Sequence, residues 1–148
     1  MEYLSRVGIK PGPLYGQLKR GEQVTAPDGT IVSPTDVLGE PKKGRIVTIL
    51  GDTRPCEGVG KLATGADLLV HEATFLHELA STAHTYYHST ARQAAEAALE
   101  AGAGSLYLTH FSSRYKSEEQ LEALALEARE IFPASHLAIE HVLYPIER

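Results

Sequence analysis

RIVTILGDTRP, residues 45–55, contains a short apolar run that ends on a glycine and then a carboxylate. Residues 46–50 are apolar or β-branched, as expected for a strand buried in a sheet. Asp52 follows where the chain leaves this strand. Ligands of layered α/β proteins collect beyond the carboxyl ends of the strands. Asp52 is therefore a candidate site residue, although an aspartate at a strand exit is also a common turn residue.

Two further apolar runs are followed by polar residues at their ends. DLLVH, residues 67–71, is continuous and apolar, like strands buried on both faces of a sheet, and leads into Glu72. SLYLTH, residues 105–110, ends on His110. An acid, a His-Glu pair and a histidine at three such ends can converge on one site, and their oxygen and nitrogen atoms are common zinc ligands. Taken alone, His110 is more often a structural histidine.

The segments between and after these runs have helical patterns. HSTARQAAEAALEAG, residues 88–102, places Thr90 and Gln93 three apart as a capping box and closes on a glycine. SEEQLEALALEAREIF, residues 117–132, repeats the capping box and carries an apolar stripe of helical period. Strands that alternate with helices predict an α/β domain over residues 45–148, with one or two more β segments near its end.

Residues 1–44 have a different character. GIKPGPLYG, residues 8–16, has two prolines and three glycines in nine residues, which are too many breakers for a helix. VTAPDGTIV, residues 24–32, has two short β-prone runs around Asp28-Gly29 and predicts a hairpin. We therefore expect an arm-like extension that contains a hairpin and has little core of its own.

Charge is unevenly distributed along the chain. The net charge of −5 argues mildly against a nucleic-acid binder. Residues 1–45, however, hold seven Lys and Arg against five acids, whereas the remaining residues hold seven against fourteen. Such an asymmetry hints at a nucleic-acid contact on the basic side, and a merely solvated surface is the alternative.

Composition predicts a cytoplasmic globular protein. Hydrophobic residues make up 43% of the chain and charged residues 22%. No apolar run approaches the roughly 20 residues that a membrane span needs, and the N-terminal residues do not resemble a secretory signal. The single cysteine, Cys56, excludes an internal disulfide and fits a reducing compartment.

Five stretches together resemble the ribonuclease Z (tRNase Z) family of the metallo-β-lactamase superfamily, whose members cut the 3′ trailer from precursor tRNA. They are GIKPGPLYGQLKRG at 8–21, GDTRPC at 51–56, ADLLVHEATF at 66–75, HSTARQAA at 88–95 and LTHFSSRY at 108–115. The resemblance covers almost the whole chain, and the motifs stand in the family's order. It implies the C-terminal half of an αββα sandwich, with a mixed sheet and helices on one face, preceded by the arm that grips tRNA.

The resemblance also implies roles for individual residues. Asp52 would bridge two zinc ions and His110 would bind one of them, while Glu72 and His88 would hand a proton to the leaving 3′ oxygen. Such a division suits two-metal hydrolysis with general-acid help. The basic residues of the arm would hold RNA phosphates without reading sequence: Lys10, Lys19, Arg20, Lys42 and Lys43.

The ligand set that the family requires is not complete in this sequence. Its members have a His-x-His-x-Asp-His cluster and one further metal histidine upstream of the arm, and neither occurs here. Asp52 and His110 supply two ligands where a zinc site normally uses three or four. A half-sandwich also leaves an apolar sheet face uncovered. We therefore expect the chain to be inactive by itself, and to form a homodimer, to aggregate or to pair with a complementing N-terminal half.

Three functions are compatible with these patterns. The chain is part of a zinc-dependent tRNA 3′-processing endoribonuclease, or an RNA-binding remnant that holds tRNA through its arm, or an inactive fragment. The motifs at the strand ends favour the first.

Overall fold

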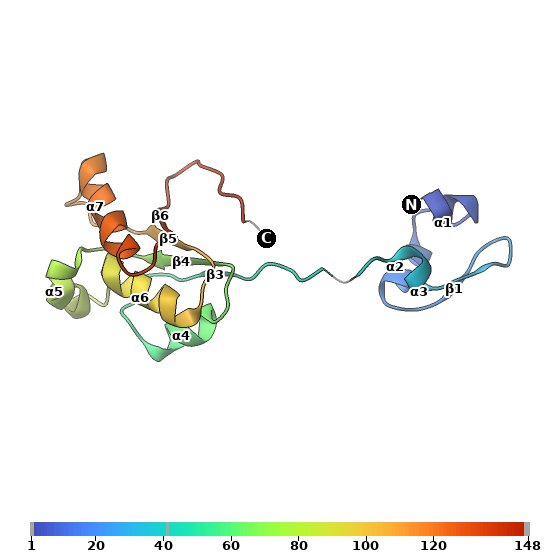
Figure 1. Ribbon diagram of the computed structural model, residues 1–148, viewed down its shortest axis with the longest axis horizontal. Coiled ribbons are helices and arrows are strands. Elements are labelled where there is room, and N and C mark those ends of the chain that lie inside the picture. Colours follow the sequence, from blue (N-terminus) through green and yellow to red (C-terminus); the bar gives the residue numbers. More distant parts are fainter. Residues whose placement is uncertain (1, 41, 147–148) are drawn as a thin grey trace. The chain divides into compact units, whose positions relative to one another are not determined.

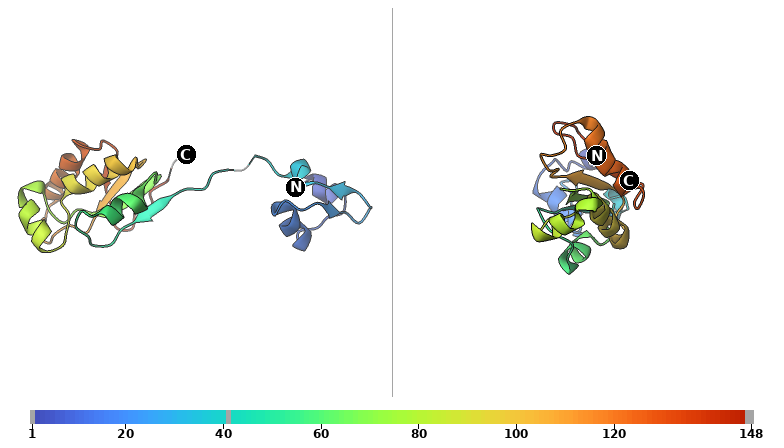
Figure 2. Two further views of the ribbon diagram at one scale, coloured as in Figure 1. Left: turned by 90° about the horizontal axis from the view of Figure 1, so that it is seen from below. Right: turned by 90° about the vertical axis from the view of Figure 1, so that its left-hand side faces the viewer.

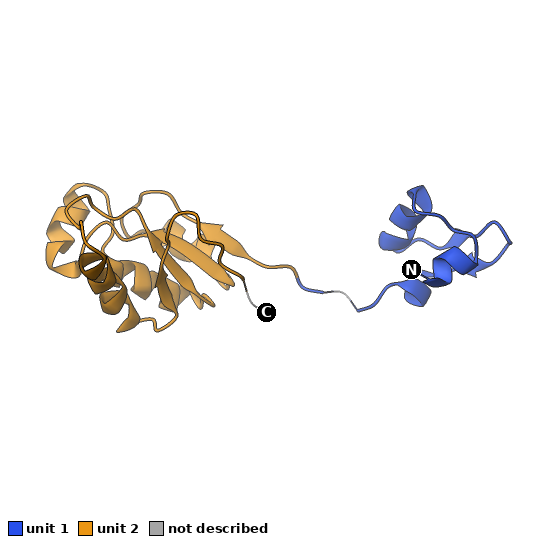
Figure 3. Ribbon diagram, turned by 90° about the horizontal axis from the view of Figure 1, so that it is seen from above, with its two compact units in different colours: residues 1–43 blue, residues 44–148 orange. Residues whose placement is uncertain are grey.

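The computed structural model describes residues 2–40 and 42–146. The chain divides into two compact units, Met1–Lys43 and Gly44–Arg148 (Figure 3). In the described part of the chain, no helix has the length and apolar character needed to cross a membrane.

Unit 1 consists of short elements around a small core. Its helices are α1 (Glu2–Arg6), α2 (Pro13–Lys19) and α3 (Pro34–Val37), and its strands are β1 (Val24–Thr25) and β2 (Ile31–Val32). The two strands pair antiparallel around the turn at Asp28-Gly29. In that turn the Thr30 N–H donates to Asp28 Oδ1 at 2.9 Å, which lowers the pKa of the Asp28 carboxyl, and Gly29 adopts a φ of 86°.

The expectation that breakers prevent a helix in residues 8–16 is wrong. Helix α2 begins inside the stretch rich in proline and glycine, because Pro13 occupies the first turn, where a missing N–H costs no helical hydrogen bond. The segment has a small core. Its buried members are Leu4, Ile9, Leu18, Val24, Ala26 and Val32.

Unit 2 is built on a four-stranded sheet in the order β3-β4-β5-β6 (Figures 1 and 2). The strands are β3 (Val47–Ile49), β4 (Leu68–Glu72), β5 (Leu106–Thr109) and β6 (Ser135–Leu137). All three strand pairs are parallel, so the expectation of a mixed sheet is wrong for the described residues. Glu72 lies opposite Thr109, and Ile49 lies opposite Val70. The carboxyl ends of β3, β4 and β5 therefore lie at the same end of the sheet.

The helices of unit 2 are α4 (Glu57–Ala63), α5 (Ala80–Thr85), α6 (Ala91–Ala101) and α7 (Glu118–Arg129), with a short 3₁₀ turn, η1 (His77–Leu79), after β4. The two predicted helices are confirmed as α6 and α7. At the start of α6, Thr90 Oγ1 accepts from the Gln93 N–H, and the Gln93 side chain accepts from the Thr90 N–H. Gly102 ends this helix with a φ of 62°. Unit 2 therefore has the α/β fold that the alternating pattern predicts.

One face of the sheet packs against the helices. Leu69, Leu106 and Leu108 point to this face and share a buried core with alanines of α6 and with Leu124 of α7. Burying each leucine contributes about 1.5–3 kcal/mol. The small alanine side chains allow α6 to approach the sheet closely. This packing fixes the carboxyl ends of the strands relative to one another.

The opposite face of the sheet is apolar, buried at Leu68 of β4 and exposed at β3. Val47 is 42% exposed and Ile49 is 73% exposed, and Val70 and Tyr107 are half-buried. Tyr144 packs on Tyr107 with 4.5 Å between ring centroids, and burial together with Tyr144 raises the pKa of the Tyr107 hydroxyl. Within the described residues, no aromatic side chain is seen to pack on Val47 and Ile49 of the outer strand β3 as Tyr144 packs on Tyr107.

Gly104, just before β5, permits a close approach of two backbone segments. A Cβ at this position would lie 2.7 Å from the carbonyl oxygen of Asp67. We expect Gly104→Ala to lower the free energy of unfolding by about 1–3 kcal/mol, because the backbone must shift. Gly60→Ala in α4 is the matched control. A Cβ there meets nothing within 4 Å, so this variant should gain about 0.5–1 kcal/mol. Urea denaturation measures both, and a Gly104→Ala chain as stable as its parent would contradict the account.

Candidate active site

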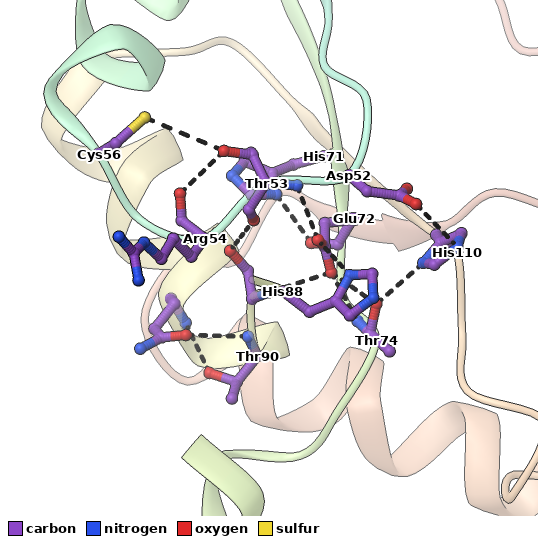
Figure 4. A network of polar contacts seen from close by, with 12 residues as sticks. Asp52, Thr53, Arg54, Cys56, His71, Glu72, Thr74, His88, Thr90 and His110 are labelled. Atoms are coloured by element: carbon purple, nitrogen blue, oxygen red, sulfur yellow. Dashed lines mark hydrogen bonds and ion pairs between the residues drawn. The ribbon is translucent and has the colours of Figure 1, made fainter. Parts of the chain in front are cut away.

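The carboxyl ends of the strands bring four of the predicted site residues together (Figure 4). Asp52 follows β3, Glu72 ends β4, His110 follows β5, and His88 comes from the loop between α5 and α6. Asp52 Oδ2 lies 3.3 Å from His110 Nε2, and His88 Nδ1 lies 2.8 Å from Glu72 Oε1. The rings of His88 and His110 stack with 5.1 Å between their centroids. The four side chains therefore form one continuous polar cluster.

Glu72 is the buried centre of this cluster, with 1% of its side chain exposed. Its Oε1 accepts from the Thr53 N–H at 2.8 Å and from the His88 ring. Its Oε2 accepts from the Thr74 hydroxyl and from the Ser89 N–H at 3.0 Å. One carboxylate thus fixes the loop that carries Asp52, the end of β4 and the loop that carries His88.

The hydrogen bonds keep Glu72 ionised. Burial acts to raise the pKa of its carboxyl, but the donors from Thr74, Ser89, His88 and Thr53 together outweigh burial, so the pKa lies below its ordinary value. Because an ionised carboxylate only accepts hydrogen bonds, Nδ1 of His88 must carry a proton. The other ring nitrogen, Nε2, takes no part in this hydrogen bond and is left for chemistry.

Thr74 connects Glu72 to His110, a connection that the sequence analysis missed. Its hydroxyl donates to Glu72 Oε2 and lies 2.9 Å from His110 Nδ1. A hydroxyl has one proton, so Nδ1 of His110 must be the donor to Thr74 Oγ1. When the ring of His110 is neutral, its lone pair is then on Nε2, the nitrogen that faces Asp52, and this tautomer suits metal binding through that nitrogen. The motif showed a threonine two residues after Glu72, but spacing alone does not reveal that one hydroxyl reaches both partners.

Replacing Thr74 should release His110 from this tautomer. In Thr74→Val, His110 Nδ1 loses its acceptor, and we expect a mixture of the two neutral tautomers. Nitrogen-15 chemical shifts of the His110 ring, recorded where the ring is neutral, measure the populations. Thr74→Ser keeps a hydroxyl and should retain the parent's single tautomer. Identical ring shifts in the valine variant and the parent would show that Thr74 does not set the tautomer.

Asp52, His88 and His110 are suited to hold a metal ion. Within the described residues they are the one group of three or more potential ligands whose ligand atoms all lie within 4.8 Å of one another. A carboxylate oxygen and two imidazole nitrogens match the donors that zinc and related metals take. His110 has a φ of 56°, a strained backbone conformation of the kind that occurs at functional sites. The donor set therefore fits a metal, and it includes His88 beside the two predicted ligands.

His71 precedes Glu72 but stands outside the cluster. Its side chain is buried, and Nδ1 bonds to the backbone carbonyl of Glu72 at 2.8 Å. Burial lowers the pKa of the His71 ring, and the neighbouring Glu72 only partly offsets this. His71 is therefore neutral and structural in the folded chain.

The lowered pKa of His71 makes stability depend on pH. The stabilisation that comes from burying neutral His71 is complete above pH 6.5, the ordinary pKa of histidine. It is lost as the pH falls through the lower pKa that His71 has in the folded state. We expect urea midpoints to fall as pH is lowered below 6.5, and His71→Gln to flatten that fall. The exposed His84 of α5 provides the control, His84→Gln, which should keep the parent's slope. An unchanged slope in His71→Gln would argue against this role.

The basic residues that were predicted to bind RNA are exposed. Lys10, Lys19 and Arg20 belong to unit 1, and Lys42 and Lys43 lie at its end. Arg20 is paired with Glu22 at 2.9 Å on the surface. Their contact with RNA stays a prediction.

Comparison with known proteins gives consistent matches. The beta-lactamase superfamily domain matches residues 19–111, which include all four residues of the cluster. The chain is 49% identical over 148 residues to a ribonuclease Z of Bacillus cereus (strain G9842), covering all of this chain and 48% of that protein. The same identity and coverage hold for a ribonuclease Z of Bacillus anthracis. The chain thus spans about half the length of the curated relatives it matches.

Solved structures show the same relationship. Human tRNase Z, short form, superimposes with a TM-score of 0.55 at 31% identity, over 80% of this chain and 37% of that one. The metallo-beta-lactamase fold protein YhfI from Bacillus subtilis gives a TM-score of 0.54 at 27% identity, over 62% of this chain and 36% of that one. The domain match and these structures show that the chain belongs to the beta-lactamase superfamily and carries part of the metallo-β-lactamase fold.

Proposed function

We propose that this chain forms the C-terminal section of a tRNA 3′-processing endoribonuclease of the ribonuclease Z type. The enzyme would hydrolyse the phosphodiester on the 3′ side of the discriminator region of precursor tRNA. The observation that carries this proposal is the convergence of Asp52, Glu72, His88 and His110 in a chain 49% identical to ribonuclease Z. Metal ligands next to a carboxylate-held histidine are what metal-assisted hydrolysis of a phosphodiester requires.

Zinc is the metal that we propose for the site, with Asp52 and His110 as ligands and the remaining ligands supplied by polypeptide outside these residues. A bound metal of this kind activates water and offsets the charge that develops on the phosphate. The ligands present here are too few to hold two ions tightly. The chain's own contribution is therefore to position part of the metal site and to provide the proton donor.

His88 is the proposed general acid. Its Nδ1–H donates to Glu72, which orients the ring. A water oxygen bonds to phosphorus and releases one proton to solvent as the bond between phosphorus and the 3′ oxygen breaks. The departing 3′ alkoxide takes the proton from Nε2 of His88, and the trailer leaves with a 5′-phosphate. The tRNA then ends in a 3′-hydroxyl, and neutral His88 takes up a proton from solvent before the next turnover.

A complementing N-terminal half is the proposed partner of the open sheet face. Val47 and Ile49 leave that face apolar and exposed, and the short ligand set calls for residues from elsewhere. Alone, the chain would cover the face by forming homodimers or larger assemblies. Size-exclusion chromatography with light scattering tests this. A stable monomer that also fails to bind the N-terminal half of the Bacillus cereus ribonuclease Z would refute it.

We further propose that the arm binds the RNA substrate and that the protein works in the cytoplasm. Lys10, Lys19, Arg20, Lys42 and Lys43 would hold phosphates of precursor tRNA, since all five are exposed. A free, exposed thiol at Cys56 suits the reducing cytoplasm where tRNA is processed.

An RNA-binding remnant without catalysis is the second candidate, favoured by the exposed lysines and the short ligand set. Incubation with precursor tRNA and zinc or manganese, with and without the Bacillus cereus N-terminal half, separates the two. Cleavage only on mixing supports the nuclease. Tight binding without cleavage in either sample supports the remnant. If the chain neither binds nor cleaves, both candidates fail.

A further inference from the structure

Tyr87, the residue before His88, presents an aromatic ring to solvent beside the cluster. The residue is 64% exposed, so burial does not explain its position. Its φ of 63° lies in the left-handed region, which bulky residues rarely adopt. Strained conformations of this kind concentrate at functional sites, because the surrounding structure must hold them in place.

Arg54 supports one face of this ring. Its guanidinium carbon lies 4.8 Å from the centroid of the Tyr87 ring. Arg54 comes from the loop that carries Asp52, and Tyr87 from the loop that carries His88. Those loops are joined where the Ser89 hydroxyl donates to the Thr53 carbonyl at 2.7 Å. The stacked pair therefore rests on the same framework as the cluster.

The charge of Arg54 is available for a ligand. Among the described residues no carboxylate forms an ion pair with it, unlike Lys61, Arg92 and Arg129, which are paired. Figure 4 shows Arg54 on the opposite side of His88 from Asp52 and His110. A planar guanidinium is well suited to bind phosphate oxygens.

We propose that Tyr87 and Arg54 form a nucleotide subsite, in which the open face of Tyr87 stacks on an unpaired base and Arg54 binds a phosphate of the same strand. Aromatic rings and guanidinium planes are the usual platforms for single-stranded RNA. The inference rests on the proposed RNA substrate. Because stacking tolerates every base, the subsite selects a single-stranded segment next to the scissile bond and not a particular sequence.

A titration with labelled hairpin RNAs tests the subsite. Each hairpin has a dye in its loop and a single-stranded 3′ tail with 2-aminopurine at the first, second or third position. The 148-residue chain is added, and dye anisotropy reports binding while 2-aminopurine emission reports stacking. We expect emission to fall at one tail position. Tyr87→Leu should abolish that fall and weaken binding by about 5- to 100-fold.

Matched variants separate stacking from folding. Tyr86→Leu removes a neighbouring tyrosine that is 67% exposed, and it should change neither signal. Tyr87→Phe keeps an aromatic ring and should keep the emission change. Tyr87→Asn tolerates a positive φ, so it preserves the backbone while removing the ring, and it should behave like the leucine variant.

The outcomes distinguish the two levels of the proposal. Binding without an emission change at any tail position refutes the subsite and leaves RNA binding intact. Equal effects of Tyr87→Leu and Tyr86→Leu also refute it. If the parent chain binds none of the hairpins, the proposed RNA function fails, and the subsite fails with it.

Discussion

Glu72→Ala should destabilise unit 2 by about 3 kcal/mol or more. The substitution removes the acceptor of the Thr53 and Ser89 N–H groups, the Thr74 hydroxyl and the His88 ring. Leaving a buried donor without a partner costs about 1–3 kcal/mol, and breaking a buried charged pair costs more than an exposed one. Urea denaturation followed by circular dichroism measures the loss.

Two further variants calibrate this effect. Glu57→Ala removes a carboxylate that pairs with Lys61 on the exposed surface of α4, so it should leave the urea midpoint unchanged. Glu72→Gln keeps the shape but turns one acceptor oxygen into a donor, so its loss should be smaller than that of alanine. A Glu72→Ala chain as stable as Glu57→Ala would show that the carboxylate does not hold the loops together.

Asp52→Ala should remove the metal from the assembled protein. Asp52 is the carboxylate among the three candidate metal ligands, and without it the imidazoles of His88 and His110 remain. Loss of a hydrogen bond that supports a metal ligand lowers metal affinity by about 10- to 100-fold, and we expect loss of the ligand itself to lower it further. The measurement is zinc content by elemental analysis after the chain and the Bacillus cereus N-terminal half are mixed and dialysed. Unchanged zinc content would refute the assignment of Asp52.

His88→Ala is the matched variant, because His88 belongs to the same cluster but is assigned a different role. We expect it to retain zinc while cleavage of precursor tRNA slows by about 100- to 10,000-fold, the usual contribution of a general acid. Loss of zinc from His88→Ala would show instead that His88 is a third metal ligand.

The features that could be predicted from the sequence are those with a local cause. The capping boxes at Thr90 and Ser117 depend on residues three positions apart, and both occur in the structure. The apolar runs before Asp52, Glu72 and His110 placed these residues at strand ends. Their convergence followed because neighbouring strands share an edge of the sheet.

The features that could not be predicted depend on long-range geometry. The mixed sheet is what the family resemblance implies for the larger fold, whereas the helices between successive strands make the described sheet parallel. Pro13 is a helix breaker by residue type, whereas its position in the first turn of α2 makes it compatible with a helix. The bridge from Glu72 through Thr74 to His110 joins residues that are 36 positions apart at its second step, and no local pattern encodes it.

Anomalous X-ray diffraction at the zinc edge, from crystals of the assembled protein, would locate bound zinc relative to Asp52 and His110. The account predicts a zinc peak bonded to Asp52 and His110, with Glu72 not bound to the metal and in contact with His88. A zinc peak away from Asp52 and His110, or a structure in which Asp52, Glu72, His88 and His110 lie apart, would contradict it.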